Sequence, residues 1–193
     1  MRRSIVNLLV ITLILMGCGD DITVPKPPTY LRMDLPDHDY ERKITPCGFS
    51  MELPSFFSIN DIAGNTNNGP CNLEVDMGPL NGTLYMFYYP LKSDDTLSRF
   101  INFSNDKVDD HKLKASAIND KRIIRKDKKV FGTFFELQGD VATNYQFYLT
   151  DSSQHFIRAE VLLNCRPNYD SLKPVLDYLK IDLEKIVQTL EWK

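Results

Sequence analysis

The segment from Tyr145 to Leu163 constrains the fold most, because it has the pattern of two strands joined by a short polar turn. Residues Thr150 to Gln154 include side chains that hydrogen-bond their own backbone, which favours a turn. Apolar residues alternate along both arms, and in the second arm they fall on both faces of the strand. A strand of that kind is covered on both sides. The sequence therefore predicts a central hairpin in a sheet with cover on both faces.

Similar patterns before and after this hairpin predict the rest of the domain. Alternating apolar residues predict strands at Phe49 to Leu53, Cys71 to Met77, Thr83 to Tyr89, Ser116 to Arg125 and Val130 to Leu137. Apolar residues at every third or fourth position predict a helix over about 95–112, with Asp94 or Asp95 as N-cap. Two further helices are predicted near the end of the chain, one capped by Asp170 or Ser171 and the next by Asp182.

The order of these elements predicts an α+β domain, an antiparallel β-sheet with helices on both faces. It resembles the α-β-α sandwich of the Mog1 and PsbP proteins. That resemblance concerns the fold and carries no function by itself.

The N-terminus has the form of a bacterial lipoprotein signal. Arg2 and Arg3 precede an apolar stretch, Ile5 to Met16, and then Gly17 and Cys18. Resemblance to lipoproteins implies removal of residues 1–17, a diacylglycerol on the Cys18 sulfur and a further acyl chain, such as palmitate, on its amino group. The alternatives are an ordinary signal peptide or a short membrane anchor, although the apolar stretch is too short to span a bilayer.

The next residues predict a spacer and a location in the cell envelope. Residues 18–29 contain three prolines and little to bury, so we expect an extended tether ahead of one domain over 30–193. Asp20 and Asp21 resemble the signal that sends some Bacteroidota lipoproteins across the outer membrane, or they are two solvated linker carboxylates. We expect a lipid-anchored protein of the outer membrane, on its periplasmic face or on the cell surface.

Three cysteines remain after Cys18, in an oxidising compartment where disulfides persist. Cys47 and Cys71 both follow a proline at the start of a strand-like stretch, which makes them the candidate pair and leaves Cys165 single. The alternative is that Cys47 and Cys71 are free, buried thiols that act as small apolar residues.

No motif in the chain identifies a reaction. The turn has the residue types of a catalytic triad, Asp151, Ser152, Ser153 and His155, but they lie too close along the chain, and a Gly-x-Ser-x-Gly elbow is absent. His38 and His111 have no partner at metal-ligand spacing, so we expect no metal site and no cofactor. The net charge of −3 offers nucleic acid no general attraction.

Two stretches suggest surfaces. The aromatic strand Thr83 to Tyr89 is either core or a platform for a ligand. A basic cluster is either a solvated turn or a site that docks on anionic headgroups or an acidic partner. The cluster consists of Lys121, Arg122, Arg125, Lys126, Lys128 and Lys129.

Several ordered motifs resemble the gliding-motility lipoprotein family GldD of Bacteroidota. They are the Cys18 lipobox, Tyr30-Leu-Arg-Met-Asp-Leu-Pro-Asp-His, Pro46-Cys47-Gly-Phe, Pro70-Cys71, Gln146-Phe-Tyr-Leu-Thr-Asp-Ser-Ser-Gln-His-Phe-Ile-Arg, Pro167-Asn-Tyr-Asp-Ser-Leu-Lys-Pro-Val and Leu190-Glu-Trp. The chain departs from the family at Met16, in the lipobox, and at Asn72, where the family has an aromatic residue.

The resemblance implies a protein required for gliding motility and the linked type IX secretion machinery. Its partners would be other gliding-motility lipoproteins and components of the secretion system. Together with the absence of catalytic motifs, this predicts a non-enzymatic accessory or scaffold. A small-molecule or lipid-binding envelope module is the alternative, and an envelope hydrolase would require a serine or carboxylate in a cleft within reach of a histidine.

Overall fold

The predicted hairpin lies at the centre of the structure. Strands β8 (Tyr145–Thr150) and β9 (His155–Leu163) pair antiparallel, with Phe147 opposite Ala159. The structure is a computed structural model that describes residues 34–61, 70–92 and 94–193, all within one compact unit, Arg32–Lys193. The expected signal peptide, the lipidation site Cys18 and the tether over 18–29 lie outside the described residues.

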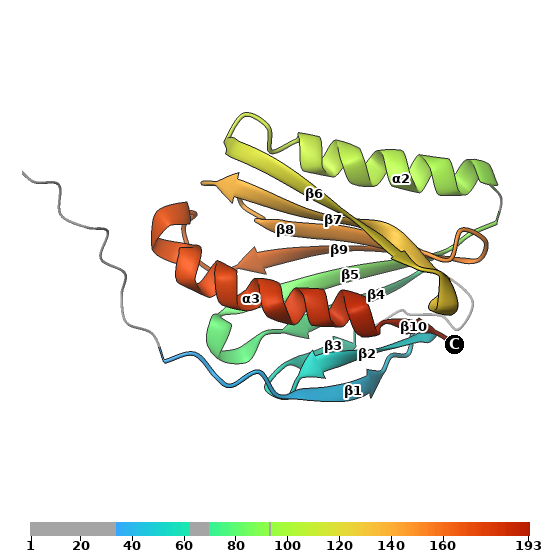
Figure 1. Ribbon diagram of the computed structural model, residues 1–193, viewed down its shortest axis with the longest axis horizontal. Coiled ribbons are helices and arrows are strands. Elements are labelled where there is room, and N and C mark those ends of the chain that lie inside the picture. Colours follow the sequence, from blue (N-terminus) through green and yellow to red (C-terminus); the bar gives the residue numbers. More distant parts are fainter. Residues whose placement is uncertain (1–33, 62–69, 93) are drawn as a thin grey trace, which may run out of the picture. The chain divides into compact units, whose positions relative to one another are not determined.

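The hairpin belongs to a seven-stranded sheet in which every pairing is antiparallel (Figure 1). Its order is β3-β4-β5-β9-β8-β7-β6. The other bounds are β3 (Ser58–Asp61), β4 (Cys71–Asp76), β5 (Gly82–Pro90), β6 (Ala115–Arg125) and β7 (Val130–Gly139). Short 3-10 turns lie at Gly78–Leu80, before β5, and at Lys126–Lys128, between β6 and β7. The α+β class and the predicted strands are confirmed.

A second, three-stranded sheet combines β1 (Tyr40–Ile44), β2 (Phe49–Pro54) and β10 (Glu191–Trp192). The sequence predicts β2 only. In β1 the sequence Tyr-Glu-Arg-Lys-Ile lacks apolar alternation, because this strand lies at an edge and leaves most of its side chains in solvent. In β10 two residues are too few for any periodic signal.

Two helices complete the described domain, α2 (Asp94–Asp109) and α3 (Tyr169–Thr189). The predicted helix over about 95–112 is α2; the side chains of its expected caps, Asp94 and Asp95, lie outside the described part. None of the described helices is long and apolar enough to cross a membrane.

The prediction of two separate C-terminal helices is wrong, because α3 is continuous. Its N-cap is Asn168, whose side chain accepts a hydrogen bond from the backbone N–H of Ser171 at 3.2 Å. Pro174 is the sixth residue of α3 and lies inside the helix, so its missing N–H removes the hydrogen bond that would reach the Asp170 carbonyl. Asp182 is not a cap: it is fully buried within the apolar stripe of α3, so the helix has no reason to end before it.

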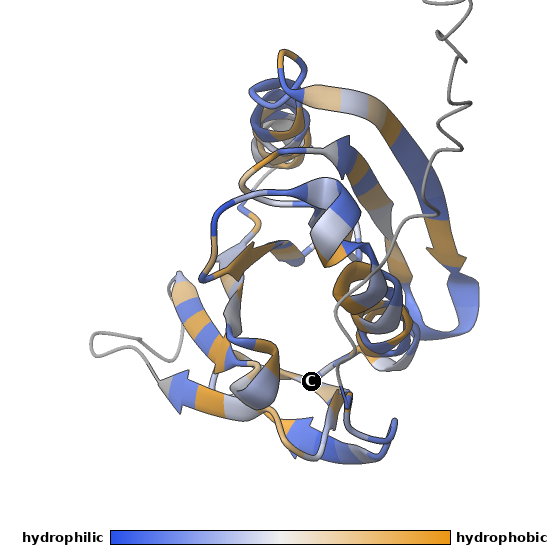
Figure 2. Cartoon of the chain, turned by 90° about the vertical axis from the view of Figure 1, so that its left-hand side faces the viewer, coloured by the Kyte–Doolittle hydropathy of each residue, from blue (hydrophilic) through white to orange (hydrophobic). Residues whose placement is uncertain are grey.

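The main core lies between the seven-stranded sheet, α3 and β2. It includes Leu84, Leu149 and Ile157 of the sheet, Leu179 of α3 and Met51 of β2. In Figure 2 some of the strands alternate between apolar and polar residues, as expected where one face is buried and the other is not. A smaller cluster joins Val108 of α2 to Leu137 and Val141.

Side chains of opposite parity in the central strands make contacts that lead to different helices. Tyr145 in β8 donates its hydroxyl to the Leu176 carbonyl of α3 at 3.0 Å. Tyr148, of opposite parity in the same strand, contacts Phe156, which contacts Phe100 of α2 at 5.3 Å between ring centroids. The sheet face that Tyr148 and Phe156 belong to is called the α2 face below.

Candidate functional site

The predicted aromatic strand has two different faces. Leu84 and Met86 are 0% and 1% exposed and belong to the main core. Tyr85, Phe87 and Tyr89 alternate with them on the α2 face and are only partly buried. One side of the stripe is therefore core, and the other side forms a surface.

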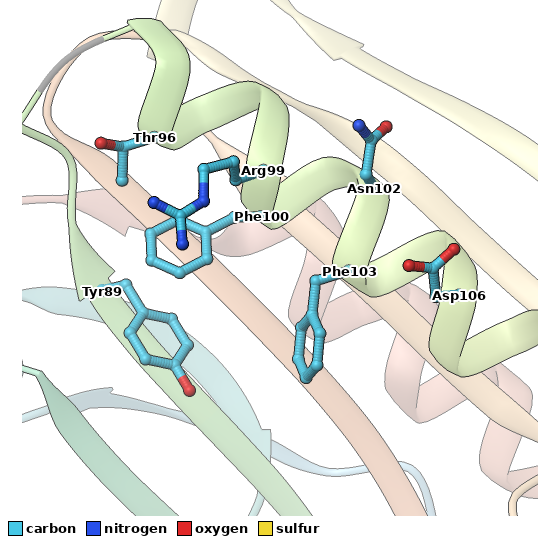
Figure 3. A pocket seen from close by; sticks show the side chains of 7 residues that line it. All are labelled: Tyr89, Thr96, Arg99, Phe100, Asn102, Phe103 and Asp106. Atoms are coloured by element: carbon cyan, nitrogen blue, oxygen red, sulfur yellow. The ribbon is translucent and has the colours of Figure 1, made fainter.

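An open groove lies where this surface meets α2. It has a volume of about 530 Å3 and is lined by Tyr89 of β5 and by residues of α2 that include Arg99, Phe100, Phe103 and Asp106. Figure 3 shows the ring of Phe100 pointing from α2 toward Tyr89, and the ring of Phe103 pointing from α2 toward the sheet further along the helix. The Tyr89 and Phe100 rings stack with centroids 4.7 Å apart, whereas Phe103 is 45% exposed. We name this cavity the α2 groove; it can receive an apolar or aromatic group.

The pairing register brings a polar cluster onto the same face. Phe87 lies opposite Arg158, which in turn lies opposite Tyr148 on the next strand. Glu160 and Gln146 are opposite each other one step further along. Antiparallel pairing puts such opposite side chains within reach of one another.

Arg158 is the centre of this polar cluster and is only 5% exposed. Its Nη2 donates to Gln146 Oε1 at 3.1 Å and also to the Glu160 carboxylate. The guanidinium carbon lies 5.8 Å from the ring centroids of both Phe87 and Phe103, at a distance typical of cation–π contacts. Phe103 therefore belongs both to the α2 groove and to the cover of Arg158.

Two donors in the cluster are unpartnered. The Arg158 Nε–H and the Gln146 side-chain NH2 are buried and have no hydrogen-bond partner among the residues that the structure describes. Gln146 is 2% exposed. An unpaired buried donor costs about 1–3 kcal/mol, so two of them in one cluster indicate a place where an acceptor is expected.

His111 contributes no stable positive charge to this region. Burial lowers the pKa of His111, and the charges of Arg158 and Lys107 act in the same direction. The carboxylates of Asp110 and Glu160 oppose that shift without reversing it. At neutral pH the imidazole is therefore uncharged, which leaves the Arg158–Glu160 pair electrically balanced.

A second polar cluster joins the first described segment to α3. His38 Nδ1 lies 2.7 Å from Asp182 Oδ1, and the Tyr40 hydroxyl donates to the same oxygen at 2.9 Å. The Tyr178 ring stacks on His38 with centroids 4.2 Å apart, and its hydroxyl donates to the Pro36 carbonyl. Asp182 Oδ2 is buried with no partner among the described residues.

The tyrosines of this second cluster resist ionisation. Burial raises the pKa of Tyr40, and its hydrogen bond to Asp182 raises it further. Burial, followed by the charges of Asp182 and Asp37, raises the pKa of Tyr178 to about 12. Both phenols are therefore neutral at physiological pH and act as hydrogen-bond donors.

The residues that suggest a triad form a turn, as the sequence indicates. Asp151 Oδ1 accepts hydrogen bonds from the backbone N–H groups of Ser153, Gln154 and His155 at 2.8–2.9 Å. Burial raises the pKa of Asp151, but these bonds together bring it below its ordinary value. His155 instead lies 2.8 Å from the Tyr88 hydroxyl.

Half of the basic cluster has partners inside the domain. Arg125 donates to the carbonyls of Val187 and Leu190, at the C-terminal end of α3. Lys121 pairs with Glu184, and Lys128 pairs with Glu191. These three residues connect the β6–β7 hairpin to the end of the chain, which favours the interpretation of the cluster as part of a solvated turn.

The two candidate cysteines meet. The Cα atoms of Cys47 and Cys71 lie 5.6 Å apart, a separation that a disulfide can bridge, and Cys165 is exposed. The pairing itself stays a prediction. Within residues 34–61, 70–92 and 94–193, no group of three His, Cys, Asp or Glu side chains could hold a metal ion.

Sequence reasoning missed Arg158, Gln146 and Asp182 as site residues. A signal exists for two of them. Arg158 lies between apolar residues of β9, Ile157 and Ala159, and Asp182 occupies an apolar position of the helical stripe between Leu179 and Ile186. Charged residues are rarely buried fully without a partner. A charged residue at each of these positions therefore predicts a polar partner, but the sequence does not identify which residue it is.

The comparisons with known proteins agree with the motifs. The model of one protein family, described as Gliding motility lipoprotein GldD, matches residues 20–192. A comparison with curated proteins finds no match. The matched range includes every strand and helix of the described domain.

Proposed function

Because the chain belongs to the gliding motility lipoprotein family GldD, we propose that it acts in gliding motility as a non-enzymatic accessory protein that binds other gliding proteins. The partners in this proposal are other gliding-motility lipoproteins and components of a type IX secretion machinery. The domain is held at the outer membrane by the lipid on Cys18. Residues 1–17 are the signal peptide, 18–29 the tether and 30–193 the domain of this proposal.

The observation that supports binding is the α2 groove. Phe103 is 45% exposed beside the partly buried Tyr89, in a cavity of about 530 Å3. Aromatic side chains in a concave, partly apolar site are typical of residues that anchor a protein partner. The groove therefore offers a partner an apolar pocket with Arg99 and Asp106 on its α2 side.

The second polar cluster supports a role without catalysis. His38 and Asp182 have the spacing of a base and its orienting carboxylate, but the hydroxyl beside them is the Tyr40 phenol. Burial raises the pKa of that phenol, so it is a weak nucleophile at neutral pH. Since Tyr178 stacks on His38, the cluster is better explained as a structural connection.

A photoreactive residue in the groove tests the proposal. We expect p-benzoylphenylalanine in place of Phe103 to crosslink, in intact cells, to a gliding or secretion component that mass spectrometry identifies. The matched control replaces Ile181, which is 53% exposed on α3. If both positions gave the same products, or if position 103 gave none, the groove would not be the docking surface.

The second candidate function is binding of a small apolar molecule or a lipid, and the opening of the groove beside Tyr89 favours it. In that case the purified domain, extracted and analysed by mass spectrometry, carries a bound lipid or metabolite. Replacing Phe100 and Phe103 with alanine would then remove the bound molecule while Ile181→Ala would retain it.

We also infer that the domain is an α-β-α sandwich of the Mog1 and PsbP kind, with helices on both faces of the large sheet. The contacts of Tyr145 with α3 and of Phe156 with α2, from side chains of opposite parity, support this layering. An experimental structure superposed on those folds tests it.

A further inference from the structure

The unpartnered donors under α2 form one hydrogen-bonding unit. Gln146 accepts from Arg158 through its Oε1, so the free NH2 of the same amide lies next to the guanidinium. The free Nε–H belongs to that guanidinium. Both side chains are more than nine-tenths buried. Two adjacent donors of this kind require one acceptor or two acceptors close together.

The charge balance selects the kind of acceptor. The Arg158 charge is already compensated by Glu160, with which its Nη2 forms an ion pair. A second carboxylate would face Glu160 in a buried place, and uncharged His111 would not offset it. A neutral carbonyl oxygen can accept from the free donors without adding charge.

The aromatic residues around Arg158 indicate which kind of molecule would supply that carbonyl. The guanidinium is covered by the rings of Phe87 and Phe103, and Phe103 also lines the α2 groove. Phe103 is the more exposed of these two rings, so a rotation of this one side chain changes the cover of Arg158. Every residue of a peptide has a backbone carbonyl next to its side chain, so an apolar residue supplies both the acceptor and the group that fits the groove.

We propose that Arg158 and Gln146 bind a backbone carbonyl of a partner peptide whose adjacent aromatic or aliphatic side chain enters the α2 groove. This rests on the proposed docking function and identifies the partner segment as an apolar peptide. In the complex the Arg158 Nε–H and the Gln146 NH2 donate to the peptide, and Phe103 packs on its side chain.

Nuclear magnetic resonance of the purified domain tests the proposal with N-acetyl-L-phenylalanine amide as the probe. We expect saturable shifts of the Arg158 Nε–H and Gln146 side-chain NH2 signals. N-acetyl-L-alanine amide, which lacks the ring, and N-acetyl-L-phenylalanine, which carries a carboxylate, should each bind at least about tenfold more weakly.

Matched variants distinguish binding at this site from nonspecific binding of the probe. Phe103→Ala should weaken binding of the probe at least about tenfold, and Ile181→Ala on α3 should leave it unchanged. Arg158→Lys keeps the positive charge and removes the Nε–H, so it should weaken binding in a domain whose folding the spectrum itself verifies. If Arg158→Lys does not fold, the shifts of the Arg158 and Gln146 signals in the unaltered protein decide alone.

Two results would overturn the proposal. One is a probe that shifts neither donor signal at concentrations where the Phe103 ring signals already saturate. The other is a long-lived internal water at the Arg158 Nε–H that the probe does not displace. Photo-crosslinking at position 103 can succeed in either case, so a failure here is distinguishable from a failure of the docking function.

Discussion

At the scale of single residues, buried Asp182 is the group that most needs hydrogen-bond donors from elsewhere in the chain. It is a fully buried acid in the middle of α3, and its bonds to His38 and Tyr40 come from a segment more than 140 positions away in the chain. A buried carboxylate is tolerated when donors surround it. His38 and Tyr40 therefore fix the start of the described domain against α3.

Removing His38 tests whether buried Asp182 needs this hydrogen-bond partner for stability. We expect His38→Ala to lower the free energy of unfolding by about 1–3 kcal/mol, because it leaves the buried carboxylate without one donor. In an Asp182→Asn background the same substitution should cost less, since the amide is neutral. Urea denaturation of the four proteins gives the coupling; strictly additive costs would show that the two residues do not interact.

The tyrosines next to Asp182 predict a loss of stability in alkali. The pKa of Tyr178 is raised from 10.0 to about 12, and that of Tyr40 is raised as well. Between pH 10 and about 12, the unfolded chain releases the Tyr178 phenol proton, whereas the folded domain retains it. The free energy of unfolding therefore falls as pH rises through this range. Below pH 10 the contribution is constant.

Tyr178→Phe tests this assignment. The variant should lose part of the alkaline slope while it keeps the ring that stacks on His38. The measurement is denaturant unfolding at several pH values, with tyrosinate absorbance as the readout of ionisation. An unchanged slope would place the alkaline transition at other tyrosines, such as buried Tyr145, whose pKa burial also raises.

At the scale of elements, the two helices differ in how firmly they are packed. Among residues 96–109 of α2 only Ser104 and Val108 are buried, whereas α3 buries seven side chains along its length. The open groove runs beside α2, the less buried helix. We therefore expect α2 to be the more mobile helix, while α3 holds the core.

Hydrogen exchange should separate the two helices. We expect the amides of α2 to exchange through local openings that cost less free energy than global unfolding, because few apolar contacts break when α2 moves. The central amides of α3 should exchange only on global unfolding. Equal protection of both helices would contradict this picture of α2.

The proposed disulfide connects the two sheets. Cys47 precedes β2 of the small sheet and Cys71 begins β4 of the large one, at a sequence separation of 24. In the chain-entropy model closing a loop of this size stabilises by ~3.5 kcal/mol. Cys47→Ser or Cys71→Ser should therefore lower stability by a few kcal/mol, and Cys165→Ser should have a smaller effect because Cys165 is exposed and unpaired.

Mass spectrometry of the digested, non-reduced protein decides the pairing directly. The expected product is a peptide pair that joins Cys47 to Cys71. Alkylated free thiols at both positions, or a bridge from either one to Cys165, would overturn the pairing. The proposed lipid on Cys18 would be unaffected by either result.

At the scale of the whole molecule, the proposed function depends on the anchor. Each buried methylene contributes about 0.8 kcal/mol to membrane affinity, so two or more acyl chains hold a protein stably where one does not. We expect Cys18→Ser to release the chain from the membrane fraction and to abolish labelling with a palmitate analogue. Persistent labelling and membrane association of Cys18→Ser would contradict the proposed lipidation site.

The sequence alone determined most of the strands and the helix α2 of this protein. Strand patterns predicted β4 to β9 of the large sheet, the helical spacing predicted α2, and a run of ordered motifs pointed to the family. These signals are local: each depends on residues within one turn or one strand. Weak local signals, as in the charged edge strand β1 and the two-residue β10, were missed.

Only the tertiary structure decided which residues meet. Alternation assigns a side chain to one of two faces, but it does not say which element covers that face or which residue lies opposite. Arg158 and Gln146 become a site because the β8–β9 register and α2 bring them together under Phe103. Asp182 resembles a helix cap until folding brings a distant histidine to it, because pairing over such separations depends on packing of the whole chain rather than on local propensity.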